Sequence, residues 1–174
     1  MGLRPGRCYR TIKRPYTRQS LRKPRKGYVK GVPASKIHTF QTGTPKQEFA
    51  LTVNLLVTQA VQIRHNALEA VRVAATKALT KGLGSETNFF MKILVFPHHV
   101  MRENSMATGA GADRFQSGMR LAFGRPVGTA AQVKQNQAIL TVKAAAGKYS
   151  EVKHALKIAS SKLPVPCKIV AVAQ

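Results

Sequence analysis

The sequence predicts an α+β domain, with two helices packed on a largely antiparallel sheet, preceded by an extended basic arm. Two stretches carry apolar residues at helical spacing, and the segments between them alternate with the period of a strand. The first 47 residues contain 13 Lys and Arg, no Asp or Glu, and five of the nine prolines. We therefore divide the chain of 174 residues into an arm, 1–47, and a globular domain, 48–174, that is long enough to bury one core.

The arm is not expected to form a helix or a central strand, because proline fixes φ and lacks a backbone donor. We expect an external partner to order it. Arginine pairs with phosphate oxygens and tyrosine rings stack on unpaired bases, so the mixture favours folded RNA over plain duplex. The candidate RNA-binding residues of the arm are Arg4, Arg7, Tyr9, Arg10, Lys13, Arg14, Tyr16, Arg18, Arg22, Lys23, Arg25, Lys26, Tyr28 and Lys30.

The globular domain begins with a predicted strand and a predicted helix. Apolar residues alternate from Phe49 to Val57, which predicts a strand. Residues 64–81 predict a helix that ends at Gly82 and Gly84. Its expected buried stripe consists of Leu68, Val71, Ala75, Ala78 and Leu79.

A second strand is predicted at Phe89–Phe96, which is apolar on both parities apart from Lys92 and therefore suits a strand covered on both faces. Residues 97–113 show no clear period and contain two glycines, so we expect a long loop, which in compact domains is usually functional. Met101 and Met106 are expected in this projecting loop, with Arg102, Asn104 and Arg114 beside them. Met119 and Phe123 are expected in the core instead.

The chain closes with a strand, a helix and a strand. Residues 138–142 alternate, and a helix follows for which Ser150 is the expected N-cap and Glu151 suits the helix dipole. Pro164 and Pro166 end that helix. Its expected buried stripe consists of Val152, Ala155, Leu156, Ala159 and Leu163, and Cys167–Ala173 forms the last strand.

Composition excludes several classes of protein. The apolar runs are far shorter than the roughly 18 residues of a membrane helix, and no apolar run follows the N-terminal charges as in a secretory signal. Cys8 and Cys167 lie at opposite ends of the chain, which disfavours a disulfide scaffold or a cysteine zinc site and favours a cytoplasmic location.

Catalytic chemistry has few candidates. His98 and His99 are adjacent, so on an extended chain they point opposite ways and cannot easily share a metal ion. Asp113 is the only aspartate, which leaves little for paired-carboxylate catalysis. His65, Asn66 and His154 are expected at a helix surface or an RNA contact. We expect no catalytic residue, metal or cofactor.

The net charge of +23 points to a polyanionic partner. A membrane surface is a weaker candidate than RNA, because no amphipathic apolar face accompanies the charge. A chromatin-type duplex binder is disfavoured by the long loop and the tyrosines. The alternative from another class is an RNA-modifying enzyme with a basic guiding arm, which needs a cofactor cleft.

Three segments carry a resemblance to a known family. MGLRPGRCYR, GVPASKIHTF and MRENSMATGAGADRFQSGMRLAFGRPVG resemble the archaeal and eukaryotic form, numbered ten-e, of the universal large-subunit ribosomal protein numbered sixteen in bacteria. The end of the chain at Gln174, without a long tail, resembles the archaeal form. The resemblance implies a hammerhead-type α+β fold and a structural protein, not a catalyst, whose partners are large-subunit rRNA and neighbouring ribosomal proteins.

The resemblance also assigns roles to two segments. The arm would pack into rRNA through the positions that match the family, namely Arg4, Arg7, Tyr9, Arg10, Lys13 and Arg14. The loop at Val100–Asp113 would point towards the peptidyl-transferase centre and the tRNAs of the aminoacyl and peptidyl sites, and so help to organise rRNA for tRNA accommodation. Glu103 departs from this phosphate-rich setting. Together with Met101, the matching loop positions are Arg102, Asn104, Met106, Gly109, Gly111, Asp113 and Arg114.

Overall fold

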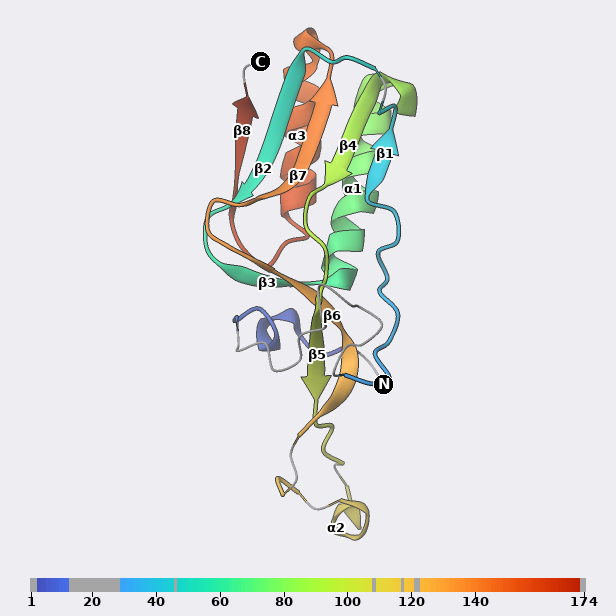
Figure 1. The fold of residues 1–174 in the computed structure, drawn as a ribbon, viewed down its shortest axis with the longest axis vertical. Helices are drawn as coiled ribbons and strands as arrows, with labels where there is room; N and C mark the ends of the chain where they lie inside the picture. Colours follow the sequence, from blue (N-terminus) through green and yellow to red (C-terminus); the bar gives the residue numbers. More distant parts are fainter. Residues whose placement is uncertain are drawn as a thin grey trace.

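The computed structural model describes residues 3–12, 29–45, 47–107, 109–116, 118–120 and 123–172. Two antiparallel sheets and two long helices make up the fold (Figure 1). The helices are α1 (His65–Leu83), the short α2 (Ala112–Phe115) and α3 (Tyr149–Ser160). The strands are β1 (Gln41–Gly43), β2 (Leu51–Val57), β3 (Val61–Arg64), β4 (Phe89–Ile93), β5 (His99–Glu103), β6 (Arg125–Val133), β7 (Ala138–Ala144) and β8 (Cys167–Val172). Short 3-10 turns lie at η1 (Gly6–Cys8), η3 (Glu86–Asn88) and η4 (Ala146–Lys148).

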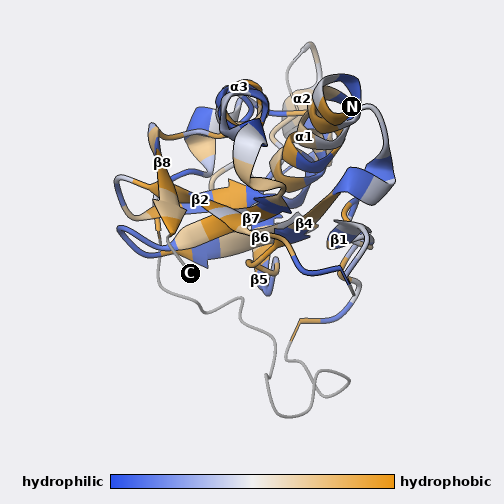
Figure 2. Cartoon of the chain, turned by 90° about the horizontal axis from the view of Figure 1, so that it is seen from above, coloured by the Kyte–Doolittle hydropathy of each residue, from blue (hydrophilic) through white to orange (hydrophobic). Residues whose placement is uncertain are grey.

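The larger sheet has five strands in the order β1-β4-β7-β2-β8, and α1 and α3 lie together on one of its faces (Figure 2). Every strand pair in it is antiparallel. The two-helix α+β architecture predicted from the sequence is therefore present. Three of the strands predicted from the sequence are confirmed as well, and they correspond to β2, β7 and β8.

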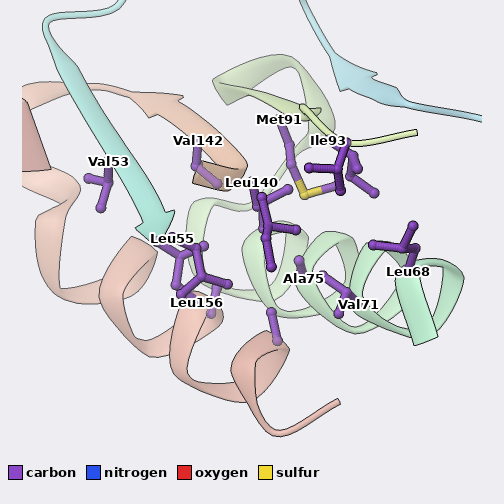
Figure 3. Packing of buried hydrophobic residues seen from close by; sticks show 14 of the residues in the cluster. Val53, Leu55, Leu68, Val71, Ala75, Met91, Ile93, Leu140, Val142 and Leu156 are labelled. Atoms are coloured by element: carbon purple, nitrogen blue, oxygen red, sulfur yellow. The ribbon is translucent and has the colours of Figure 1, made fainter. Parts of the chain in front are cut away.

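The core lies between this sheet and the two helices (Figure 3). The α1 stripe is as predicted, since Leu68, Val71, Ala75 and Leu79 are fully buried, although Ala78 is only partly buried. The sheet contributes alternate residues such as Leu55 and Leu140, because successive side chains of a strand point to opposite faces. α1 continues through Gly82 and ends at Gly84, whose φ of 80° suits glycine.

The start of α3 differs from the prediction. Lys148 is the N-cap residue, and Ser150 lies inside the helix, where its hydroxyl donates to the Glu151 carboxylate at 2.8 Å. The buried stripe is confirmed within the helix, which ends at Ser160, ahead of Leu163 and both prolines. Ser150 lies two residues past the N-cap and forms a carboxylate contact in place of a backbone cap.

The prediction for β4 was wrong in one respect. Phe89, Met91 and Ile93 are buried, but Lys92 is exposed, so one face only of the strand is covered. Leu94 follows the strand and is 47% exposed. The reason is that both long helices lie on the same side of the sheet, so the continuous apolar run does not indicate burial on two sides.

A second, three-stranded sheet, in the order β3-β6-β5, was not predicted. β5 lies inside the segment expected to be a long irregular loop, and β6 follows at a position where no strand was predicted. The two strands pair along their length, from His99 opposite Ala130 to Glu103 opposite Arg125. The irregular part of the predicted loop is therefore shorter than 97–113.

Three apolar side chains lie where the prediction did not place them. Met101 is 6% exposed, because it sits in β5 and not in a flexible projection. Met119 and Phe123, expected in the core, are 80% and 68% exposed. Their segment lies beyond the paired part of the β5–β6 hairpin, where the domain offers no core to cover them.

The described parts of the predicted arm contact the globular domain. Residues 41–43, assigned to the arm from sequence, form the edge strand β1, which pairs with β4. Ile37 is 2% exposed and belongs to the core. Most of the predicted RNA-binding residues of the arm lie outside the described residues: Lys13, Arg14, Tyr16, Arg18, Arg22, Lys23, Arg25, Lys26 and Tyr28.

Candidate nucleic-acid interface

The N-terminal segment, residues 3–12, lies along the edge strand β3 of the small sheet. The Gln62 backbone N–H donates to the Arg10 carbonyl at 2.8 Å, and the Gln62 side-chain amide donates to the Tyr9 carbonyl at 2.9 Å. The Arg64 guanidinium donates to the Arg4 carbonyl at 2.8 Å. An edge strand has backbone groups that its own sheet leaves unpaired, and here the segment accepts a hydrogen bond from one of them, the Gln62 N–H. This differs from the expectation that only an external partner orders the arm.

Four side chains fasten this segment to the C-terminal end of β5, and we call Arg4, Tyr9, Arg64 and Glu103 the N-terminal clasp. The Tyr9 hydroxyl donates to the Glu103 carboxylate at 2.7 Å, and Arg4 forms an ion pair with the same carboxylate. The Arg64 guanidinium lies over the Tyr9 ring, 5.6 Å from its centroid. Burial, and then the hydrogen bond to Glu103, raises the pKa of Tyr9 to about 12.

The clasp explains why an acidic residue, Glu103, stands in a segment that is expected to lie among phosphates. The Glu103 side chain is 17% exposed and is occupied by two partners within the chain. It therefore does not face a phosphate in this conformation. Arg7 and Arg10 are exposed, and the segment that carries them is held in a defined position on the domain.

His65 was expected at a surface or an RNA contact, but it is buried and links three parts of the fold. It is 9% exposed at the first position of α1, and its Nδ1 accepts the Lys36 backbone N–H at 2.7 Å. Gly128 of β6 lies against its other nitrogen, since a Cβ there would come within 2.9 Å of Nε2. Burial, with help from the positive charges of Lys36 and Arg64, lowers the pKa of His65. The neutral imidazole thus links residues 29–45 to both α1 and the small sheet.

The β5–β6 hairpin projects from the body of the molecule and carries α2 at its far end (Figure 1). Arg102 supports the end of the paired strands nearest the tip, because its guanidinium donates to the Gly124 carbonyl at 3.0 Å and lies 4.0 Å from the centroid of the Phe123 ring. Gly124 itself permits close approach, since a Cβ there would lie 2.5 Å from the Glu103 carbonyl carbon. Asn104, which directly follows β5, is half-buried.

The far end of the hairpin is apolar, cationic and exposed. Phe115 is 88% exposed and Met106 is 47% exposed, and the exposed Arg114 and Arg120 are interspersed with them. Gly109 and Gly111, with φ of 133° and 79°, adopt conformations that suit glycine. The Asp113 side chain lies outside the described part of the chain. Arginine can bind phosphate here and phenylalanine can stack on a base.

The sequence-predicted residues fall into two separate groups. Arg4 and Tyr9 meet the Arg102 region where the paired strands β5 and β6 end, whereas Met106, Gly109, Gly111 and Arg114 lie in the segment beyond them. Phe115 at the far end was not selected from the sequence. Its sequence neighbours, which include glycines and arginines, could have indicated an exposed position, because such neighbours are unusual for a core residue.

Other chemistry has little support among the residues described. No three His, Cys, Asp or Glu side chains of this part of the chain lie close enough to hold a metal ion. His98 contacts the Phe96 ring at 4.7 Å, and its neighbour His99 is half-buried in β5. No helix in the described ranges combines the length and the apolar character needed to cross a bilayer.

Comparison with known proteins gives consistent matches over nearly the whole chain. The family model described as ribosomal protein L16p/L10e matches residues 16–170. A protein of Saccharolobus islandicus (strain L.S.2.15 / Lassen #1) is 52% identical over 171 residues, which cover 97% of this chain and 92% of the relative. Relatives from Saccharolobus solfataricus and Metallosphaera sedula are 50% and 48% identical, and cover 97% and 99% of this chain and 92% and 95% of their own lengths. Each of these relatives is named large ribosomal subunit protein uL16.

Proposed function

The chain belongs to the ribosomal protein L16p/L10e family, and from this membership we propose that it is a structural part of the large ribosomal subunit that binds large-subunit rRNA. The observation that carries the proposal is the match to uL16 proteins over 97–99% of the chain, which includes both the N-terminal segment and the hairpin. The protein then acts in translation within the cytoplasmic ribosome, beside rRNA and neighbouring ribosomal proteins.

The N-terminal segment is proposed to bind rRNA phosphates. The clasp holds residues 3–12 against β3, so that the exposed Arg7 and Arg10 are presented from a fixed backbone. Fixing the backbone before binding reduces the conformational entropy lost on contact with RNA. The basic residues at 13–30, Lys30 among them, extend the same charge. Their cations offset phosphate repulsion where RNA segments converge.

The hairpin is proposed to reach towards the peptidyl-transferase centre and the tRNAs of the aminoacyl and peptidyl sites. Two paired strands form its stem, and Arg102 contacts Gly124 and Phe123 where the stem meets the tip. Its exposed end combines arginines with Phe115, a composition suited to phosphates and unpaired bases. In this role the domain organises rRNA for tRNA accommodation, and it performs no chemical step. The alternative of an RNA-modifying enzyme has no support in the comparisons.

A salt titration tests the contribution of the segment. We expect Arg7→Ala with Arg10→Ala to weaken binding to purified large-subunit rRNA and to lower the log–log salt slope by roughly 1.4 to 1.8, since each phosphate contact contributes about 0.7 to 0.9. Lys134→Ala with Lys162→Ala removes the same charge from two exposed positions outside the segment and the hairpin, and is expected to leave the slope near that of the parent. Equal slopes for the first variant and the unmodified chain would contradict the assignment.

A further inference from the structure

The large sheet has a second face, which points away from α1 and α3 and which we call the outer face (Figure 2). Strand alternation assigns residues to it, because the alternate positions of the same strands form the core. Leu94 continues β4 on this side, and its N–H donates to the Ile139 carbonyl at 2.8 Å. The outer face consists of Thr52, Asn54, Leu56, Phe90, Lys92, Leu94, Thr141, Lys143, Lys168, Val170 and Val172.

The charge of the outer face has one sign. It carries Lys92, Lys143 and Lys168, and none of its residues, all of which the structure describes, is acidic. Across its middle, Lys92 pairs in register with Thr141, which in turn pairs with Asn54. The Thr141 hydroxyl donates to the Asn54 side-chain oxygen at 2.8 Å. This face therefore complements a polyanion, with polar side chains between the cations.

An aromatic column lies just beyond the end of β4, where Phe40, which also packs against the core, supports the Phe96 ring. The Phe40 and Phe96 rings stack with centroids 5.2 Å apart and planes inclined by 23°, and the His98 ring follows at 4.7 Å from Phe96. The Phe40 carbonyl accepts the Ile93 N–H at 2.8 Å, which fixes this column beside the end of β4. Phe96 is nevertheless 51% exposed, and His98 at the end of the column is exposed as well.

We propose that the outer face and the column of Phe40, Phe96 and His98 bind an unpaired RNA strand. Bases would stack on the column at His98, and Lys92, Lys143 and Lys168 would hold the phosphates. Sheets that present exposed rings among cations bind single-stranded RNA in this manner, because every base has a π-face and every nucleotide a negative charge. A protein partner would have to supply acidic groups to all three lysines as well as rings for the column, whereas every nucleotide of an RNA strand supplies both.

The proposal rests on the proposed function in one respect, namely that RNA is the partner, but it concerns a different surface. The N-terminal segment and the hairpin meet the small sheet, whereas the outer face belongs to the large sheet. Stacking on the column also differs from phosphate binding in its response to salt. Electrostatic binding weakens steeply as salt rises, and stacking does so much less.

The test uses the full-length protein with two probes, a single-stranded RNA that carries one 2-aminopurine and the same sequence as a blunt duplex. Binding is measured at a salt concentration that suppresses most of the phosphate contribution. We expect Phe96→Leu with His98→Ala to weaken single-strand binding by roughly 5- to 150-fold, the effect of losing one stacked base. The 2-aminopurine quenching that accompanies stacking should disappear, and duplex binding should be unchanged.

Two further variants separate stacking from folding. His98→Tyr keeps a ring at the end of the column and should retain both the affinity and the quenching. Tyr149→Leu removes an aromatic ring that is 38% exposed at the start of α3, away from the outer face, and should behave as the unmodified chain. Circular dichroism of each variant reports whether the fold is kept.

The outcomes distinguish this inference from the proposed function. Unchanged single-strand affinity and quenching in the double variant would overturn the inference, while co-sedimentation of that variant with large subunits would leave the proposed function standing. Equal losses of single-strand and duplex binding in a folded variant would also overturn it, because stacking on the column requires unpaired bases. If the unmodified chain bound neither rRNA nor large subunits, the proposed function would fail first.

Discussion

Replacing Glu103 by Gln tests whether the N-terminal clasp positions the basic segment. The substitution keeps the shape of the side chain and removes its charge, so that Arg4 loses its ion pair and Tyr9 keeps a neutral acceptor. The Arg4 side chain is 49% exposed, so its pair is worth at most about 1 kcal/mol after solvent screening. The bond from Tyr9 to a carboxylate is worth about 1.5 to 3 kcal/mol, of which a neutral acceptor retains roughly half.

The sum is about 1 to 2 kcal/mol of docking free energy, which corresponds to opening of the segment roughly 5 to 30 times more often. The Gln62 amide reports this opening directly, because it donates to the Arg10 carbonyl across the junction. Its hydrogen exchange, followed by NMR, should accelerate by that factor in Glu103→Gln. Amides of β7, in the large sheet, should exchange at their original rates and serve as the internal control.

The Tyr9 phenol gives a second readout of the same substitution. Its pKa is about 12 in the folded chain against an ordinary 10.0, so the contribution of the neutral phenol to docking is fully present below pH 10 and is lost as the pH rises through 12. In Glu103→Gln the ultraviolet titration of Tyr9 should move towards the ordinary pKa without reaching it, because burial is the larger cause of the shift. Unchanged Gln62 exchange together with an unchanged Tyr9 titration would refute the positioning role of Glu103.

Two further substitutions test residues at contacts between elements of the fold, His65 and Gly43. Burial lowers the pKa of His65 below its ordinary 6.5, so the free energy of unfolding should be constant above pH 6.5 and should fall as the pH drops through the lowered value. In urea unfolding, His65→Gln should therefore show a weaker dependence on pH than the unmodified chain. The control His154→Gln, at an exposed position, should keep the original dependence. Gly43 has a φ of 95° and faces the Phe89 carbonyl oxygen, so Gly43→Ala should lose about 1 to 3 kcal/mol or more in thermal unfolding, whereas Gly147→Ala, which meets nothing within 4 Å, should lose little.

The larger sheet and its helices could be predicted because their burial follows a simple period. Leu68, Val71 and Ala75 repeat at helical spacing, and Val53 and Leu55 alternate, so sequence and burial coincide. The small sheet shows no such pattern. The buried run of β6 ends in the small residues Thr129, Ala130 and Ala131, and β5 mixes histidine, arginine and glutamate, so neither strand is distinguishable from a polar loop by periodicity.

The interface was predictable in residue type and not in arrangement. Composition identified Arg4, Tyr9 and Arg102 as candidates, but the partner of the first two, Glu103, lies 94 positions from Tyr9, and no local pattern encodes that contact. The predicted burial of two residues was also wrong. Met119 and Phe123 were expected in the core because such residues are usually buried, but their segment lies at the projecting end of the hairpin, away from the core.

The separation between Tyr9 and Glu103 also has a consequence for biosynthesis. Translation produces the cationic leader first, and the carboxylate that receives it is polymerised 94 residues later. A nascent chain therefore emerges from the exit tunnel with its earliest positive charges unneutralised, in surroundings crowded with ribosomal phosphates. The N-terminal segment can dock on its own domain only after Glu103, at the end of β5, has also left the tunnel.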